Sequence, residues 1–147
     1  MRLTYLLAAL FAGALMPIQA GINARLRLAL GEPIMASLVS FAVGSAAILV
    51  YILATRTPWP GLAAAASAPW WAWIGGSMGA CFVVASVVLA YKMGATALMA
   101  WSIAGSLLAS VLLDHQGLLG FSVRELSWQR MAGVALLLSG AGLVNEL

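Results

Sequence analysis

Hydrophobic residues along the chain form five long apolar stretches, which short polar or proline-containing segments separate. A helix needs roughly 20 apolar residues to cross a bilayer core of about 30 Å. The pattern therefore predicts an all-α membrane protein in which residues 1–147 form a single five-helix transmembrane domain. The predicted spans are residues 3–23, 34–54, 70–91, 95–113 and 128–145.

The segments between the stretches carry signals that end or begin helices. Pro33 follows Gly31 and Glu32 and suits the first turn of the second helix. Residues 92–94 leave room for only a very short turn, so the helices on either side are predicted to be antiparallel neighbours. Ser127 is expected to cap the fifth helix.

Composition explains why these helices belong in a membrane. Hydrophobic residues make up 64% of the chain and charged residues 7%, whereas soluble domains carry roughly 25% charged residues. The net charge of +3 comes from scattered basic residues, which form no stripe typical of nucleic-acid binding. The lone Cys81 excludes an intrachain disulfide. The expected partner is the lipid bilayer, with no nucleic acid, metal or cofactor.

The basic residues are almost evenly divided between the two sides of the membrane. The spans put Arg2, Arg56, Arg124 and Arg130 on one side and Arg25, Arg27 and Lys92 on the other. Lys and Arg normally concentrate on the cytoplasmic side, so this small bias predicts insertion in both orientations. Two oppositely oriented copies would form an antiparallel, dual-topology homodimer, a ten-helix inverted-repeat unit of the kind common in transporters. The alternative is one orientation with a weak determinant.

Small residues recur at four-residue spacing, as in the contacts of membrane helices. The second helix carries Ala36, Ser40 and Gly44 in this register, which predicts tight helix packing. The predicted dimer contact is the fifth helix, because its glycines stand in an otherwise plain Leu/Val sequence. They are Gly133, Gly140 and Gly142.

Neutral polar residues are the candidates for a binding site, because no Asp, Glu, Lys or Arg lies in the middle of a predicted span. Gln19 and Asn23 are four residues apart and share a face of the first helix, just past Pro17. They could bind a solute or form hydrogen bonds between helices.

A row of polar residues also follows the fourth helix. Ser102, Ser106, Ser110 and Asp114 are each four residues apart, which gives a seam that drifts about 40° per step. Trp101, beside the inner end of the seam, could stack on a ligand. The seam could line a transport path, or its serines could bond to their own backbone.

Asp114 and His115 are adjacent at the end of the fourth helix. Neighbouring positions on a helix do not face each other, so the two do not form a catalytic pair by spacing. Histidine often takes part in proton transfer, which makes the two residues candidates for coupling or gating. The alternative is a simple cap at the membrane surface.

Three segments carry a resemblance to a known family: Gln19–Asn23, Leu112–Gly120, and Leu126–Gly133 followed by Leu138–Gly140. In these segments the chain resembles the YdcZ-like five-helix proteins of the drug/metabolite transporter superfamily, relatives of the small multidrug resistance transporters. The most specific part is the Asp-His-x-Gly-Leu-Leu-Gly sequence that begins at Asp114. The resemblance implies five-helix units that pair antiparallel or fuse, with Gln19 and Asn23 toward a central cavity.

One departure from the relatives concerns their coupling residue. The small multidrug transporters use a membrane-embedded glutamate in helix 1 to exchange protons for cations. The first helix here contains no acid and has Gly13, Ala14 and Leu15 in its middle. The difference argues against proton-coupled cation export by that mechanism.

The expected function is transport of a small metabolite or drug-like solute by alternating access, in a multi-pass protein of the inner (plasma) membrane. The predicted substrate site near the midplane comprises Gln19, Asn23, Trp101, Ser102 and Ser106. A scaffold or accessory subunit without transport activity is one alternative, and a passive channel is another. An enzyme is not expected, because the spans contain no nucleophile–base or paired-acid arrangement.

Overall fold

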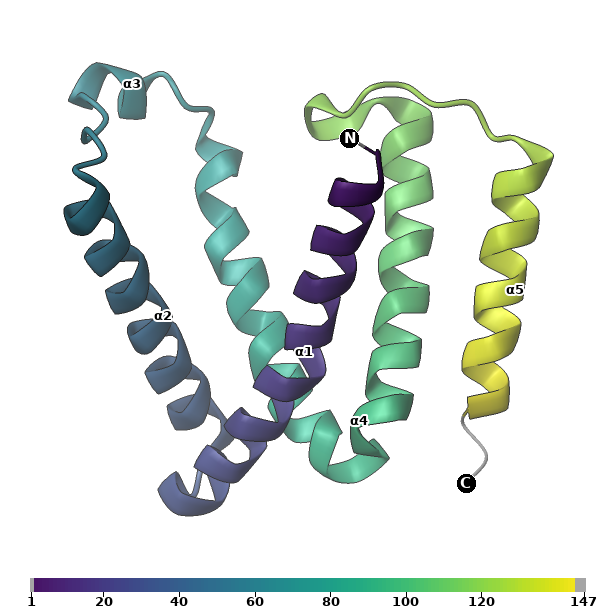
Figure 1. Cartoon of the computed structure of the whole chain (residues 1–147), viewed down its shortest axis with the longest axis horizontal. Coiled ribbons are helices and arrows are strands. Elements are labelled where there is room, and N and C mark those ends of the chain that lie inside the picture. The colour runs from purple at the N-terminus through teal and green to yellow at the C-terminus, as the bar shows by residue number, and fades with distance from the viewer. Residues whose placement is uncertain (1, 145–147) are drawn as a thin grey trace. The chain divides into compact units, whose positions relative to one another are not determined.

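The structure, a computed structural model, describes residues 2–144 and is all-helical over that range (Figure 1). The predicted helical fold class is therefore confirmed. Residue 145, the predicted end of the last span, lies outside the described residues. The helices are α1 (Arg2–Leu30), α2 (Pro33–Thr55), α3 (Leu62–Ala66), a 3-10 turn (Trp70–Ile74), α4 (Gly75–Gln116), a second 3-10 turn (Leu118–Gly120) and α5 (Trp128–Val144).

The first two long helices begin and end where local chemistry requires it. α1 is continuous across Pro17, although proline has no N–H to donate to the carbonyl of Gly13. Pro33 occupies the first turn of α2, as predicted. That helix stops at Arg56, whose left-handed backbone (φ 51°) turns the chain away. The predicted loop after it contains the short α3.

α4 has 42 residues, which at about 1.5 Å per residue is about twice the thickness of a bilayer core. Its helical path is broken at Gly94, where φ is 77° and ψ is 166°. Only glycine adopts this conformation readily. Lys92 and Met93 remain helical, so the break is narrower than the predicted turn over residues 92–94.

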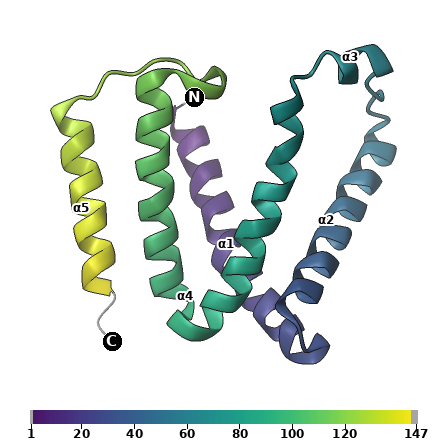
Figure 2. The ribbon, with the colours of Figure 1, turned by 180° about the vertical axis from the view of Figure 1, so that it is seen from behind.

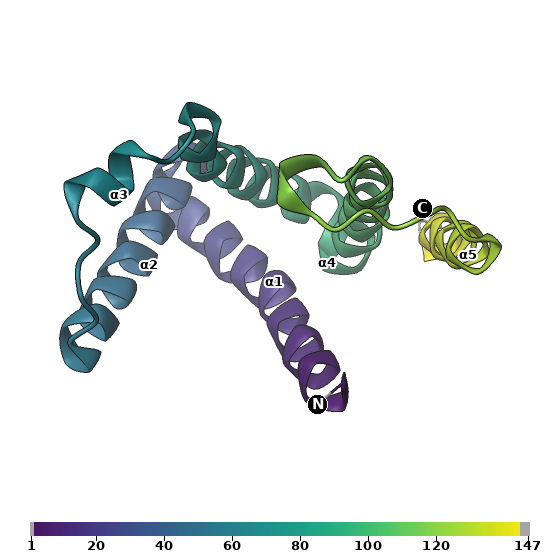
Figure 3. The same ribbon diagram turned by 90° about the horizontal axis from the view of Figure 1, so that it is seen from above.

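α5 begins at the residue that the sequence indicates. The backbone N–H of Arg130 donates to the Ser127 hydroxyl at 3.3 Å, which confirms the predicted N-cap. Figure 2 shows α5 beside the second part of α4. Figure 3 shows the connection from residue 117 to residue 127 passing over the end of α4 toward α5.

Three stretches of the described chain are long and apolar enough to cross a membrane: Leu3–Leu30, Pro33–Thr55 and Trp70–Gln116. The last contains 47 residues and includes the break at Gly94. α5, with 17 residues, is not among the three. Large apolar side chains are exposed along all of these helices, as expected for surfaces that face lipid.

The chain divides into two compact units. One comprises Met1–Pro17 and Met93–Leu147, and the other comprises Ile18–Lys92. In the second unit, α2 and the first part of α4 diverge toward the end that carries α3 (Figures 1 and 2). A Cβ at Gly79 of α4 would lie 3.7 Å from the Phe41 ring of α2, so the two helices are in contact there.

The conformation at Gly94 leads to a stability prediction. Replacing Gly94 with Ala should lower the free energy of unfolding by about 1–3 kcal/mol, because a Cβ is strained at this backbone conformation. Thermal unfolding in detergent measures the effect. The matched control is Gly105→Ala in the regular part of α4, where the new Cβ would meet nothing within 4 Å among residues 2–144 apart from the helix's own backbone. Equal melting temperatures for the two variants would contradict the prediction.

Candidate functional site

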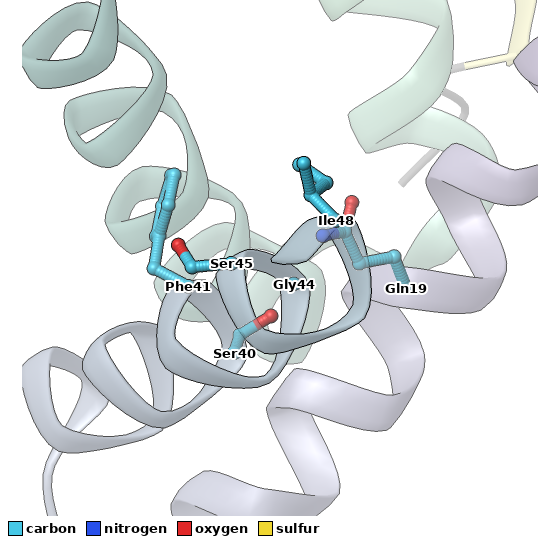
Figure 4. A pocket seen from close by; sticks show the side chains of 6 residues that line it. All are labelled: Gln19, Ser40, Phe41, Gly44, Ser45 and Ile48. Atoms are coloured by element: carbon cyan, nitrogen blue, oxygen red, sulfur yellow. The ribbon is translucent and has the colours of Figure 1, made fainter. Parts of the chain in front are cut away.

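Gln19 lies in a pocket between α1 and α2, within the unit formed by residues 18–92. Figure 4 shows its side chain reaching from α1 toward α2. The pocket has a volume of about 210 Å³. Its lining residues are Gln19, Ser40, Phe41, Gly44, Ser45 and Ile48.

The pocket lies at the middle of both helices. Gly44 is the central residue of α2 (Pro33–Thr55), and Gln19 lies in the middle third of the apolar stretch Leu3–Leu30. Helices of this length cross the whole hydrocarbon core. The polar groups of the pocket therefore lie near the depth at which transporters bind their substrates.

Only one of the three small residues on α2 is buried as the predicted tight packing requires. Ala36 is completely buried, as a helix contact requires. Ser40 and Gly44, the next two members of the series, line the pocket, and a Cβ at Gly44 would meet no atom within 4 Å. The sequence pattern alone does not distinguish a helix contact from a cavity wall, because both require small side chains.

Asn23 lies one turn beyond Gln19 on α1 and is 3% exposed. Its side-chain nitrogen is buried and has no hydrogen-bond partner among the described residues. An unpaired buried donor costs about 1–3 kcal/mol. Asn23 is therefore not the satisfied helix-to-helix contact that was the structural alternative for this residue.

Trp101, Ser102 and Ser106 belong to the other compact unit, on the second part of α4. Trp101 is 45% exposed. The Ser106 hydroxyl donates to the Ile103 carbonyl at 2.9 Å, and that of Ser110 donates to the Ser106 carbonyl at 2.7 Å. These two serines thus follow the alternative of bonding to their own backbone. The structure describes each unit by itself, so a shared site with Gln19 and Asn23 stays a prediction.

Asp114 forms an ion pair that the sequence analysis missed. Its carboxylate accepts a hydrogen bond from the Arg130 guanidinium at 2.5 Å. The Arg124 backbone N–H donates to the Asp114 carbonyl at 2.9 Å, and the Arg124 carbonyl accepts a bond from Arg130 at 3.4 Å. These three bonds tie the end of α4, the connecting segment and the first turn of α5 together. We call them the α4–α5 clasp.

The connection within the clasp is closely packed. Gly117 has a left-handed backbone (φ 62°), and a Cβ there would lie 2.6 Å from the Val123 side chain. Leu119 also has a positive φ, of 56°. His115, next to Asp114, is exposed. Opposite charges on either side of a loop were the available signal for the pair, but the path of the loop decides whether they meet.

The predicted dimer glycines on α5 have open space around them. At Gly133, Gly140 and Gly142, a Cβ would meet nothing within 4 Å in the described part of the chain, apart from the helix's own backbone. Gly140 lines a groove of about 270 Å³ together with residues of α4, and Gly133 lines another of about 230 Å³. These glycines therefore make no close helix contact within the described part of the chain.

A second contact missed by the sequence analysis joins α1 and α4 at one end of the Ile18–Lys92 unit. The Arg27 guanidinium lies 5.7 Å from the centroid of the Tyr91 ring, within the range of a cation–π interaction. Arg27 and Tyr91 also line a pocket of about 240 Å³ with Leu28 and Gly31. Among residues 2–144, no group of three or more His, Cys, Asp or Glu side chains is placed to hold a metal ion.

Comparison with known families gives a match that covers almost the whole chain. The family model described as "Putative inner membrane exporter, YdcZ" matches residues 4–143. No curated protein and no solved structure matches the chain.

The α4–α5 clasp leads to a stability prediction. Asp114→Asn and Arg130→Gln should each lower the free energy of unfolding by about 1 kcal/mol, because each removes a partly exposed ion pair. The charge-swapped variant Asp114→Arg with Arg130→Asp should recover part of the loss. Thermal unfolding measures all three.

The control for the clasp is Arg124→Gln. It removes a positive charge from the same predicted side of the membrane, yet Arg124 contributes to the clasp through its backbone. Its melting temperature should match that of the unmodified chain. A loss as large as that of Arg130→Gln would show that the effect is one of charge and not of the clasp.

Proposed function

The chain belongs to the YdcZ family of inner membrane proteins, and on that premise we propose that it transports a small metabolite or drug-like solute by alternating access. The match over residues 4–143 carries the proposal, because it covers nearly the whole chain and describes an inner membrane exporter. The apolar helices agree with a multi-pass protein of that membrane.

The division into two units supports alternating access. The chain passes from one unit to the other at two places, between residues 17 and 18 and between residues 92 and 93. Pro17 is at the first, where the helix lacks one backbone hydrogen bond. The positive-φ Gly94 lies next to the second. Hinges are a few positions that absorb a change of backbone angles, so both crossings are suited to motion between the units.

The proposed architecture has five spans. The break at Gly94 divides the 47-residue stretch into two helices, each long enough to cross the membrane, and α5 supplies the fifth. We assign two oppositely oriented copies to one ten-helix transporter, since the basic residues give almost no bias in orientation. An added Cβ at Gly133, Gly140 or Gly142 would meet no other part of the described chain within 4 Å, and this room supports α5 as the contact between the copies.

The proposed substrate site comprises Gln19, Asn23, Trp101, Ser102 and Ser106. The unpaired Asn23 amide supports this assignment, because a donor without a partner in one state is available to a substrate in another. Asp114 and His115 are assigned to gating. The ion pair between Asp114 and Arg130 supports that role, since it joins two helices near their ends.

A transporter needs Asn23 for solute flux, whereas a scaffold would need it only for assembly. Asn23→Leu should abolish solute flux while leaving the melting temperature unchanged or raised, because the replaced side-chain nitrogen forms no hydrogen bond with the described residues. Gln19→Leu should also lower flux. The measurement is uptake into proteoliposomes, over a panel of radiolabelled neutral metabolites and lipophilic cations.

Ser139→Ala on α5 is the control, because the Ser139 hydroxyl donates to its own helix at Ala135. It should keep full flux. A scaffold would show altered assembly in the Asn23 and Gln19 variants with no solute flux in any variant. A passive channel would show flux without saturation or counterflow.

The near balance of basic residues predicts dual topology, which a reporter at the C-terminus measures. Fusions active on either side of the membrane should give comparable signals. Arg25→Gln with Lys92→Gln changes the count from four against three to four against one. That variant should take a single orientation with the N-terminus in the cytoplasm. A one-sided signal from the unmodified chain would contradict dual topology.

A further inference from the structure

We propose that the pocket between α1 and α2 binds a small neutral solute that carries an amide or hydroxyl group on a flat apolar body. The inference rests on the proposed function only in treating this solute as the one transported. It assigns Ser40, Phe41, Gly44 and Ser45 to the binding site. Three features of the pocket favour such a solute: its hydrogen-bonding groups, its lack of charge and its shape.

Three side chains give the pocket unused hydrogen-bonding capacity. The Gln19 amide offers two donors and an acceptor, and the hydroxyls of Ser40 and Ser45 each offer both functions. Within residues 2–144, none of these three side chains forms a hydrogen bond. The pocket can therefore both donate to and accept from a solute.

Several other serines on the membrane helices bond to their own backbone. Ser37, one turn before the pocket on α2, donates to the Pro33 carbonyl at 2.9 Å. Ser86 on α4 and Ser139 on α5 donate to carbonyls of their own helices at 2.8 Å. Bonding to the backbone is the usual way for a serine to satisfy its hydroxyl in a helix. Among the described residues, Ser40, Ser45 and Ser102 form no such bond, and the first two line the same pocket as Gln19.

The depth of the pocket makes these free groups informative. Polar side chains in the middle of a membrane span almost always face a protein interior or a cavity, because hydrocarbon offers them no partner. A solute with complementary donors and acceptors would satisfy the three side chains. A purely apolar occupant would leave all three unpaired.

The pocket favours a neutral solute over an ion. None of its six lining residues carries a charge. An ion at this depth needs an opposite charge or full hydration to offset its desolvation, and one amide with two hydroxyls provides neither. Both anions and cations are therefore expected to bind more weakly than a neutral analogue of the same shape.

The shape of the pocket favours a small, flat body. The Phe41 ring offers a face for stacking. It lies beside Gly79 of α4, where an added Cβ would be 3.7 Å from the ring. Gly44 leaves the wall open where any larger residue would intrude. The volume of about 210 Å³ is below the range of about 300–1,000 Å³ that is typical of sites for drug-sized ligands. The solute is thus expected to be smaller than a drug molecule.

Three probes of nearly the same shape test the proposal: benzamide, benzoate and benzylammonium. We expect benzamide to bind the full-length protein in lipid nanodiscs with millimolar affinity, measured by ligand-observed NMR titration at pH 7. The two ions should bind at least tenfold more weakly. Equal binding of benzamide and benzoate, or no binding of benzamide, would overturn the proposal.

Variants separate binding in the pocket from partition into lipid. Gly44→Leu should abolish the benzamide signal by filling the pocket. In the described part of the chain, the new Cβ would meet no atom within 4 Å, so the fold should accept the substitution. Ser45→Ala should raise the Kd about five-fold through the loss of one neutral hydrogen bond. Ser139→Ala should leave the Kd unchanged. A benzamide signal that persists in Gly44→Leu would place the binding elsewhere and overturn the proposal.

The same variants distinguish failure of the pocket from failure of the transport function. Binding of benzamide that Gly44→Leu abolishes supports the pocket even if no solute crosses proteoliposomes, in which case the transport proposal alone fails. Solute flux that Gly44→Leu and Ser45→Ala leave unchanged overturns the pocket and leaves transport standing.

Discussion

The hydrocarbon solvent is the constraint on which this structure depends. Lipid offers no hydrogen-bond partner, so every backbone N–H and C=O within a span must be satisfied inside the protein. The long helices α1, α2 and α4 meet that demand residue by residue. Two positions within the apolar stretches interrupt this regular bonding: Pro17 has no N–H to donate, and Gly94 has a non-helical backbone. The chain changes from one compact unit to the other beside each of them.

The same constraint gives meaning to polar side chains that would be unremarkable in water. An exposed glutamine or serine on a soluble protein is hydrated, whereas the side chains of Gln19, Ser40 and Ser45 lie at the depth of the bilayer core. Asn23 adds a buried nitrogen without a partner. Local bonding can satisfy such groups, as Ser106 shows by donating to its own helix. Groups that do not use that option are the best candidates for contact with a solute.

The sequence predicts what local chemistry determines and misses what the path of the chain determines. The helical fold and the roles of Pro33 and Ser127 follow from hydrophobicity and capping, and the structure confirms them. The pair of Asp114 with Arg130 depends on a connection with left-handed backbone at Gly117 and at Leu119. Hydrophobic patterning contains no information on that path.

The predicted site likewise contains residues that the sequence identifies and residues that only the structure identifies. Gln19 and Asn23 were identifiable because amides are rare in apolar helices. Ser40 and Gly44 were interpreted as packing residues, since small side chains suit both a helix contact and a cavity wall. Only the absence of neighbours around Gly44 distinguishes the two roles. That distinction requires the positions of α1 and α2 in three dimensions.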